Sequence, residues 1–394
     1  MLALLIVGAL VVGPELKSGP FQPTGQPADC PALALAIGRD THFLAWPAVE
    51  GGTTGIAATL LDSTFAEVPG RRIFIPLPTH PACPSAATSG DDIVLVWSRS
   101  IGDADAIEAA RFGTDLRLLE GATRLTSSSP VGTRPAVAWN AIAGGTYLIA
   151  AGTQWLELRS PRLADARAFP IQPWPWNSNT SWGVVWTLMY DAVTSAETSF
   201  ALTARGRSTR WSGCNFARPG CGSAGPFTSI AIASPHWLWP EQIALEQSPF
   251  LSPTTIACAG NDCLTVWFRY LSESAAQTVT GFEVYGKWSS QARWVFLGGS
   301  AGISGLTSAS DGERVLVVWE TPTNALEAAI LTPAGIQESF LLATGSEPRT
   351  RPSAVSLGSR RFLVGYAIED SAVSHRLGGR IVSVDVPARR RIAR

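Results

Sequence analysis

The stretch PSAATSGDDIVLVW, residues 84–97, decides the fold of this sequence, because its pattern recurs along the chain. A proline begins the pattern, small or β-branched residues follow, a glycine marks a turn, and an apolar run ends in an aromatic residue. This run, the second strand-like piece of the pattern, is almost wholly apolar. Such a run is typical of a strand buried on both faces of a sheet. Further copies end at Trp46, Ala150 (without the aromatic), Trp186, Trp267, Trp319 and Tyr366.

The spacing of these copies indicates the size of the repeating unit. Subtracting residue numbers gives 51 residues from Trp46 to Trp97 and 52 from Trp267 to Trp319. Each unit also holds a third strand-like piece after the aromatic residue, such as residues 325–331, and a fourth after a glycine-containing turn. Four strands in about 50 residues match a kelch-sized blade. The sequence therefore predicts an all-β fold, a β-propeller of about seven four-stranded blades, with six or eight blades also open.

The ends and the middle of the repeat series are irregular. The last repeat begins at Pro352 and lacks a fourth strand, so we expect the N-terminal segment, residues 14–25, to complete the last blade. The interval after Ala150 is short, which indicates a deleted loop. The interval before Trp267 is long, and we expect an insertion at about residues 210–250, or a degenerate extra blade in its place.

An apolar run, residues 2–12, opens the sequence. A membrane span needs about 20 apolar residues, whereas the apolar part of a signal peptide has about 7–15. We therefore interpret residues 1–13 as a signal peptide-like segment and residues 14–394 as a single propeller domain. The alternative is that the run forms a buried N-terminal strand.

The six cysteines form suggestive pairs. Two of them flank a tight turn, two enclose a short loop, and two precede a proline at the same place in neighbouring repeats. Six cysteines allow 15 connectivities, and the pairs we predict are Cys30–Cys83, Cys214–Cys221 and Cys258–Cys263. Such pairs indicate a secreted, periplasmic or cell-surface protein. A metal site that includes His80 and Cys83 is the alternative, but the scattered histidines and the lack of C-x-x-C favour no metal.

Charge and composition limit the partners of the protein. Charged residues make up 15% of the 394 residues and the net charge is −1, so no strong field attracts nucleic acid or anionic lipid. We expect a monomer with no membrane span in the mature chain and no cofactor. The expected partner is an unknown glycan or protein.

The repeat order also resembles a known group of proteins. A P-x-A start, a glycine, an L-V-V-W run and an A-x-L-type strand are similar to the degenerate propeller-like repeats of bacterial cell-surface proteins, both secreted proteins and lipoproteins. The resemblance covers about residues 30–386, and most proteins of that group have no known function. Lipoproteins of this kind carry a cysteine directly after the signal peptide, whereas the first cysteine here is Cys30.

Two sets of tryptophans have different interpretations. The recurring Trp46, Trp97, Trp267 and Trp319 are expected to pack as wedges between blades, with ligand stacking as the alternative. A second set lies in irregular stretches, where aromatic faces and amide groups suit a sugar ring or another apolar ligand. The candidate ligand-binding residues are Trp174, Trp176, Asn177, Asn179, Trp182, His236, Trp237 and Trp239. The alternative is that these residues cover blade edges.

No catalytic motif stands out. The sequence has no Walker loop or H-E-x-x-H motif. We therefore expect a secreted, non-enzymatic repeat protein that serves binding or scaffolding at the bacterial cell surface. The alternative is a carbohydrate-active propeller enzyme or a lectin that uses a Trp-rich rim.

Overall fold

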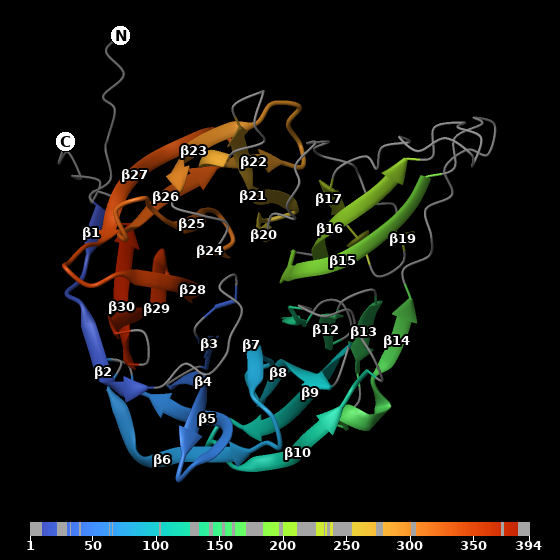
Figure 1. Ribbon diagram of the computed structural model, residues 1–394, viewed down its shortest axis with the longest axis vertical. Coiled ribbons are helices and arrows are strands. Elements are labelled where there is room, and N and C mark those ends of the chain that lie inside the picture. The colour runs from blue at the N-terminus through green and yellow to red at the C-terminus, as the bar shows by residue number, and fades with distance from the viewer. Residues whose placement is uncertain are drawn as a thin grey trace, which may run out of the picture.

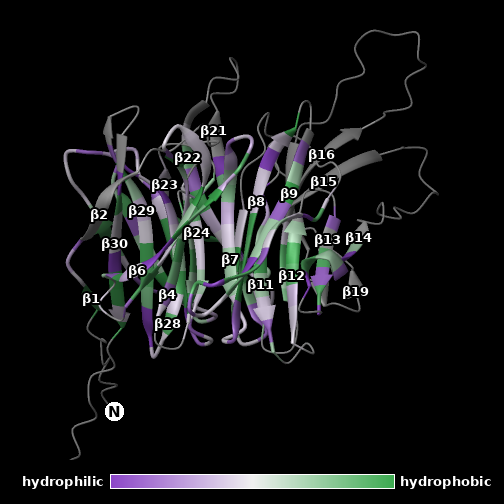
Figure 2. Cartoon of the chain, turned by 90° about the horizontal axis from the view of Figure 1, so that it is seen from below, coloured by the Kyte–Doolittle hydropathy of each residue, from purple (hydrophilic) through white to green (hydrophobic). Residues whose placement is uncertain are grey.

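The computed structural model is an all-β protein (Figure 1). It describes residues 10–21, 30–31, 33–38, 41–62, 64, 66–101, 104–126, 134–141, 145–151, 154–159, 162–170, 184–196, 200–210, 226–231, 233–234, 237–238, 254–272, 279–300, 305–371 and 374–384. Within these residues, one 3-10 turn, η1 (Leu163–Asp165), accompanies the strands. In the side view of Figure 2 the strands stand next to one another, with hydrophobic residues along their middle.

The first three blades follow the chain in order. Blade 1 comprises β3 (Ala34–Ile37), β4 (His42–Glu50), β5 (Thr53–Leu61) and β6 (Glu67–Pro76). Blade 2 comprises β7 (Pro81–Thr88), β8 (Asp92–Ile101), β9 (Ala104–Gly113) and β10 (Leu118–Arg124). Blade 3 comprises β11 (Ala136–Asn140), β12 (Thr146–Ala151), β13 (Gln154–Leu158) and β14 (Arg167–Pro170).

The other four blades complete the ring. Blade 4 comprises β15 (Val184–Ser195), β16 (Phe200–Arg210) and β17 (Pro226–Ala231), followed by the short pair β18 (Ala233–Ser234) and β19 (Trp237–Leu238). Blade 5 comprises β20 (Thr254–Ala259), β21 (Asp262–Ser272), β22 (Val279–Trp288) and β23 (Val295–Ser300). Blade 6 comprises β24 (Leu306–Ser310), β25 (Val315–Glu320), β26 (Leu326–Thr332) and β27 (Gly335–Ala343). Blade 7 comprises β28 (Arg349–Gly358), β29 (Arg361–Ser371), β30 (Ser374–Val384), β1 (Leu10–Val12) and β2 (Leu16–Phe21).

The first strands of the blades form a closed ring around the central axis. The strands β3, β7, β11, β15, β20, β24 and β28 each contact the next in this order, and β28 contacts β3 again. The ring therefore has seven blades in the described part of the chain. The predicted β-propeller of about seven blades is confirmed.

The N-terminal segment closes the ring, as predicted. Strands β1 and β2 both pair antiparallel with β30, and Figure 1 shows these N-terminal strands beside the last strand of the chain. The expected segment was residues 14–25, and β2 lies within it. Strand β1 lies earlier, in residues 10–12, where the apolar run ends. Strand β1 thus lies within the signal peptide-like segment, residues 1–13, and cleavage of that segment stays a prediction.

Three side chains fasten this closing segment. Glu15, between β1 and β2, pairs with Arg349 of β28, with 3.2 Å between Oε1 and Nε. The Tyr366 hydroxyl of β29 donates to the same Glu15 oxygen at 2.8 Å. The side chain of Arg349 is 4% exposed and that of Glu15 is 12% exposed, so this is a buried ion pair. We call Glu15, Arg349 and Tyr366 the clasp.

The recurring aromatic residues pack between blades, as predicted. Trp97 of blade 2 lies in one buried cluster with Phe43 of blade 1. Trp319 of blade 6 packs in the same way with Val266 of blade 5, and Tyr366 of blade 7 packs in a cluster with Val318. Each aromatic side chain thus faces the preceding blade. This packing buries the apolar faces that a single four-stranded sheet would expose.

The glycine of the repeat has a conformational role. Gly90 and Gly312 lie in the turns between the first and second strands of their blades, with φ of 95° and 93°. A Cβ at either position would meet no neighbouring atom within 4 Å. The left-handed backbone, and not crowding, therefore favours glycine in these turns.

Blades 3 and 4 carry the predicted irregularities. Strands β12 and β13 are separated by two residues only, so the loop after Ala150 is indeed short. The run that ends at Trp186 lies in β15, which contacts the first strands β11 and β20. The repeat pattern assigned this run to a second strand, and it is the innermost described strand of its blade instead. Strand β17 lies inside the stretch expected to be an insertion.

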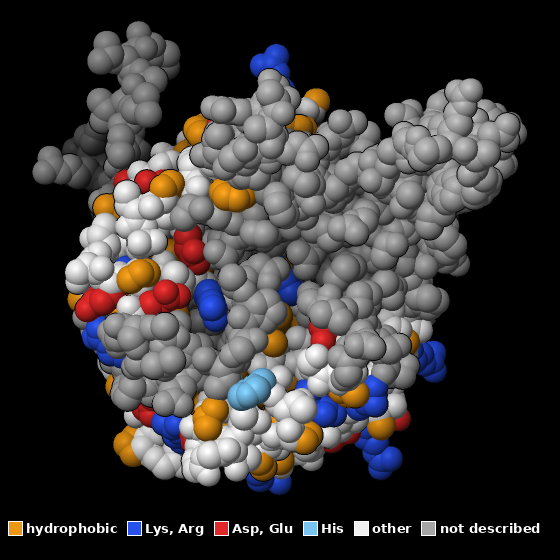
Figure 3. All heavy atoms as spheres, in the orientation of Figure 1, with side chains coloured by type: hydrophobic (Ala, Val, Ile, Leu, Met, Phe, Trp, Pro, Cys, Tyr) orange, Lys and Arg blue, Asp and Glu red, His pale blue; other side chains and the backbone are white. Residues whose placement is uncertain are grey.

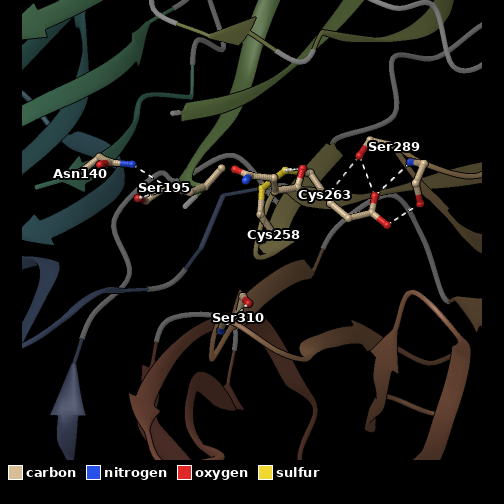
Figure 4. The surroundings of a disulfide bond; sticks show 11 residues. Asn140, Ser195, Cys258, Cys263, Ser289 and Ser310 are labelled. Atoms are coloured by element: carbon tan, nitrogen blue, oxygen red, sulfur yellow. Dashed lines mark hydrogen bonds between the residues drawn. A yellow bond between two sulfur atoms is a disulfide. The ribbon is translucent and has the colours of Figure 1, made fainter. Parts of the chain in front are cut away.

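Two of the predicted disulfides are present. Cys30 bonds to Cys83, which joins the segment before β3 to β7. Cys258 bonds to Cys263 across the β20–β21 hairpin, where the two residues are directly paired (Figure 4). The hydroxyl of Ser289 accepts a hydrogen bond from the Cys263 amide at 3.1 Å. The predicted Cys214–Cys221 pair lies outside the described residues.

Candidate functional site

Most of the predicted binding residues lie outside the described part of the chain. These are Trp174, Trp176, Asn177, Asn179, Trp182, His236 and Trp239. The backbone of Trp237 lies in β19, where it pairs with Ser234. The Trp-rich rim therefore stays a prediction, and the described residues offer a different aromatic site on blade 5.

Four aromatic residues form this site, which we call the aromatic ladder: Trp267, Tyr285, Trp294 and Phe296. Trp267 of β21, Tyr285 of β22 and Phe296 of β23 are direct cross-strand partners. Ring centroids are 6.4 Å apart between Trp267 and Tyr285 and 5.5 Å apart between Tyr285 and Phe296. Trp294 precedes β23 and lies edge-on to Trp267 at 5.4 Å and to Tyr285 at 6.0 Å.

The ladder runs from the interior to the surface. Trp267 is fully buried, with 0% exposure, while Trp294 is 39% exposed and Phe296 is 52% exposed. Both exposed residues rank among the large hydrophobic side chains that the described surface presents to water. Contacts between rings hold them in place, so the exposed rings are pre-organised rather than free to rotate.

Strand alternation explains which way the ladder faces. In β22 the neighbours Val284 and Trp288 are buried in the cluster shared with blade 6. Successive strand residues point to opposite faces of a sheet, so Tyr285 lies on the opposite face, toward blade 4. The same reasoning applies to Trp267, whose neighbour Val266 packs toward blade 6.

Polar groups border the ladder. The guanidinium of Arg269 lies 5.8 Å from the ring centroid of Tyr285, a cation–π distance. The Tyr285 hydroxyl donates to Oε2 of Glu283 at 3.0 Å. Arg269 and Glu283 are cross-strand partners themselves, so a cation and a carboxylate lie side by side at the edge of the aromatic surface.

The repeat pattern does not predict this site. It predicts a packing role for the recurring Trp267, which the buried ring confirms, and no role for Tyr285, Trp294 or Phe296. Two signals were present: the polar–aromatic alternation of FEVYGKW, residues 282–288, and the pair of aromatics in RWVF, residues 293–296. Neither signal reveals which rings meet, because that depends on the pairing of three strands.

Hydroxyl groups join the first strands of neighbouring blades. Oγ of Ser85 accepts a hydrogen bond from the amide of Val137, between blades 2 and 3. Thr255 and Ser308 share a hydrogen bond of 2.8 Å between blades 5 and 6. Hydroxyl groups therefore link blade 2 to blade 3 and blade 5 to blade 6 at their first strands.

A charged hollow lies at the outer part of blade 3. Its volume is about 640 Å³, and its described lining residues are Glu157, Arg159, Asp165 and Arg167. Arg159 pairs with Glu157 at 3.3 Å.

Over the described residues there is no group of three His, Cys, Asp or Glu side chains that could hold a metal ion. Among the same described residues, no helix is long and apolar enough to cross a membrane.

Comparisons with known proteins identify the fold and nothing narrower. No protein-family model matches the sequence, and no curated protein matches it. Among solved structures, the polysaccharide lyase Uly1 is 8% identical with a TM-score of 0.55, covering 95% of this chain and 99% of the lyase. The WD40 domain of Toxoplasma gondii coronin is 11% identical with a TM-score of 0.53, covering 98% of this chain and 88% of that one. At such identities the likeness establishes the β-propeller fold alone.

Proposed function

We propose that this protein is a non-enzymatic carbohydrate-binding propeller and that the aromatic ladder of blade 5 binds the ring of a sugar. The observation that carries the proposal is the exposure of Trp294 and Phe296 beside Arg269 and Glu283. A pyranose ring has an apolar face of C–H groups and an edge of hydroxyl groups. The rings of the ladder suit the face, and the flanking cation and carboxylate suit the hydroxyl edge.

The chemistry of the ladder favours a sugar over an apolar partner. Aliphatic side chains dominate the other exposed apolar positions, for example Ile336 and Leu341 on β27 of blade 6. The ladder instead presents flat rings, and it combines them with the charged groups of Arg269 and Glu283 at its edge. A site that joins a few aromatic faces with a few polar groups is typical of small-ligand recognition.

The disulfides support an extracytoplasmic location for this activity. Cys30–Cys83 and Cys258–Cys263 are both buried, and protein disulfides persist mainly in oxidising compartments. A secreted, periplasmic or surface-exposed propeller would meet polysaccharides there. Binding or scaffolding at a cell surface is the role that follows from this proposal.

Calorimetry with a panel of soluble polysaccharides and oligosaccharides tests the proposal. Trp294→Ala and Phe296→Ala should each weaken binding of the best ligand by about tenfold, because each removes one stacking surface. Leu341→Ala is the matched control, since it shortens an exposed apolar side chain on the outer strand of the next blade. Equal binding by all three variants, or no binding by any panel member, would contradict the proposal. Release of reducing ends from a panel member would assign catalysis instead.

A further inference from the structure

In each repeat, one residue directly precedes the recurring proline. These pre-proline residues have no part in the proposed function. In blades 1 and 2 this pre-proline residue is Cys30 and Cys83, and in blades 3 and 7 it is Arg134 and Arg351. All four residues lie at the start of the first strand of their blade, next to the central axis. Two cysteines and two arginines thus occupy equivalent places around one end of the ring.

The Cys30–Cys83 disulfide shows how near these places are. Its two Cα atoms are 4.8 Å apart although they belong to different blades. Pre-proline residues of neighbouring blades therefore converge at this end of the axis. In ring order, Arg351 of blade 7 and Arg134 of blade 3 lie on the two sides of this disulfide.

The backbone confirms that the positions are equivalent in structure. Cys83 has φ of 52° and Arg351 has φ of 55°, and in each case the strand pairing shifts register at this point. Gly305, at the corresponding place in blade 6, has φ of 72°. A left-handed conformation at a non-glycine residue is costly and is concentrated at functional sites.

A carboxylate anchors the backbone of Arg351 from the neighbouring blade. Oε1 of Glu320, at the end of β25, accepts a hydrogen bond from the Arg351 amide at 2.6 Å. A Cβ added to Gly305 would lie 2.0 Å from this same oxygen, so glycine leaves the space in which Glu320 reaches across. Blades 6 and 7 are linked at this level by Glu320, as blades 1 and 2 are linked by the disulfide.

The side chain of Arg351 differs from that of its neighbour Arg349. Arg349 is buried and committed to the clasp through Glu15. The guanidinium of Arg351 is half-buried, and it takes part in no ion pair or hydrogen bond with the part of the chain that the structure describes. Arg134, on the other side of the disulfide, is 8% exposed. In the described first strands, Asp191 of β15 is the single carboxylate-bearing residue.

We propose that Arg351 forms an anion-binding site at this end of the central axis, beside the Cys30–Cys83 disulfide. The ligand group is an oxyanion, either a carboxylate or a sulfate or phosphate ester, because the planar guanidinium fork matches the paired oxygens of such groups. Arg351 supplies the recognising charge, and Glu320 anchors its backbone. This site is separate from the aromatic ladder on blade 5.

Binding of defined anions to the purified full chain tests this site. The probes are sodium sulfate and sodium phosphate as free ions, polygalacturonate for carboxylates, and dextran sulfate for sulfate esters, each titrated at low and at high salt. Arg351→Gln should weaken binding of the best probe by about tenfold, and Arg351→Lys should weaken it less, since lysine keeps the charge but loses the fork. Affinity should also fall as salt increases.

Two controls separate this site from general charge and from the ladder. Arg117→Gln removes the same charge from an exposed turn of blade 2, and it should leave the affinity unchanged. Free sulfate and phosphate carry no sugar ring, so a loss of their binding in Arg351→Gln is independent of the ladder. Wild-type affinity in Arg351→Gln, or no binding of any probe at low salt, would overturn the proposal.

Discussion

Tyr147 of blade 3 donates a hydrogen bond to Asp92 of blade 2, with 2.7 Å between the phenol oxygen and Oδ1. The same phenol oxygen accepts a hydrogen bond from the amide of Ser89 at 2.9 Å. Asp92 also forms an ion pair with Arg111 of its own blade. Tyr147 and Asp92 are 4% and 7% exposed, so a buried polar network joins blades 2 and 3 beside the apolar cluster that they share.

Tyr147→Phe should lower the free energy of unfolding by about 1–3 kcal/mol, because it removes one hydrogen-bond partner of the buried Asp92 carboxylate. Urea unfolding followed by circular dichroism measures this loss. Tyr285→Phe is the matched control, since its hydroxyl binds Glu283 at a partly exposed site and should contribute less than about 1 kcal/mol. Equal losses in the two variants would contradict the assignment.

Acid should weaken the junction between blades 2 and 3. Burial raises the pKa of Asp92, but hydrogen bonds from Ser89 and Tyr147 and the charge of Arg111 lower it by more, so the pKa lies below its ordinary value of 3.8. A carboxyl whose pKa is lowered by folding stabilises the fold above its unfolded pKa and loses this contribution as pH falls through the folded pKa.

The stability difference between the wild type and Asp92→Asn should therefore be constant from pH 7 down to about pH 5 and shrink below about pH 4. Urea midpoints of both proteins at successive pH values measure it. A difference that does not change down to pH 2.5 would show that the ionised carboxylate is not what stabilises this junction.

The clasp should contribute more to stability than a surface ion pair. Glu15→Gln leaves the buried guanidinium of Arg349 without its counter-charge, so we expect a loss of about 3–5 kcal/mol. Glu50→Gln is the control: it breaks the pair with Arg72, whose side chains are 39% and 49% exposed, and should cost about 1 kcal/mol or less. Hydrogen exchange of the β30 amides should accelerate in Glu15→Gln alone.

The two described disulfides should differ in how much they stabilise the folded protein. Cys30 and Cys83 are 53 residues apart, whereas Cys258 and Cys263 are 5 apart. Chain entropy gives a stabilisation of about 4 kcal/mol for the long loop and about 2 kcal/mol for the short one. Thermal unfolding of the two double Cys→Ser variants compares them. A larger loss for the hairpin disulfide would show that chain entropy does not dominate.

Repetition explains why so much of the fold could be predicted from the sequence. The apolar run before Trp97 recurs before Trp319 because both blades bury their second strand on both faces. The same physical requirement therefore produces the same sequence pattern in successive blades. The glycine turns and the paired cysteines are local features, and they too are visible in the sequence. In blade 4, where the copy ending at Trp186 is degenerate, the pattern placed the run one strand too far from the axis.

The sites were less accessible because they depend on contacts between distant segments. Trp267, Tyr285 and Phe296 line up only through the register of three strands, and the pairing of β22 with β23 shifts between Val284 and Tyr285. Glu15 and Arg349 are 334 residues apart in the chain. Local patterns contain no information on such pairs, so the ladder and the clasp appear only in the folded ring.

The pairing of β1 and β2 with β30 also has a consequence for the order of events during synthesis. The earliest described segment has its partner in residues 374–384, so its backbone groups stay unpaired until those residues have been synthesised. The intermediate blades can form hairpin by hairpin as they emerge, but the ring can be sealed only as the final step. Until then the chain is an open arc with two exposed sheet edges. These edges could pair with other chains, so this is the interval in which aggregation is most favoured and a chaperone would be most useful.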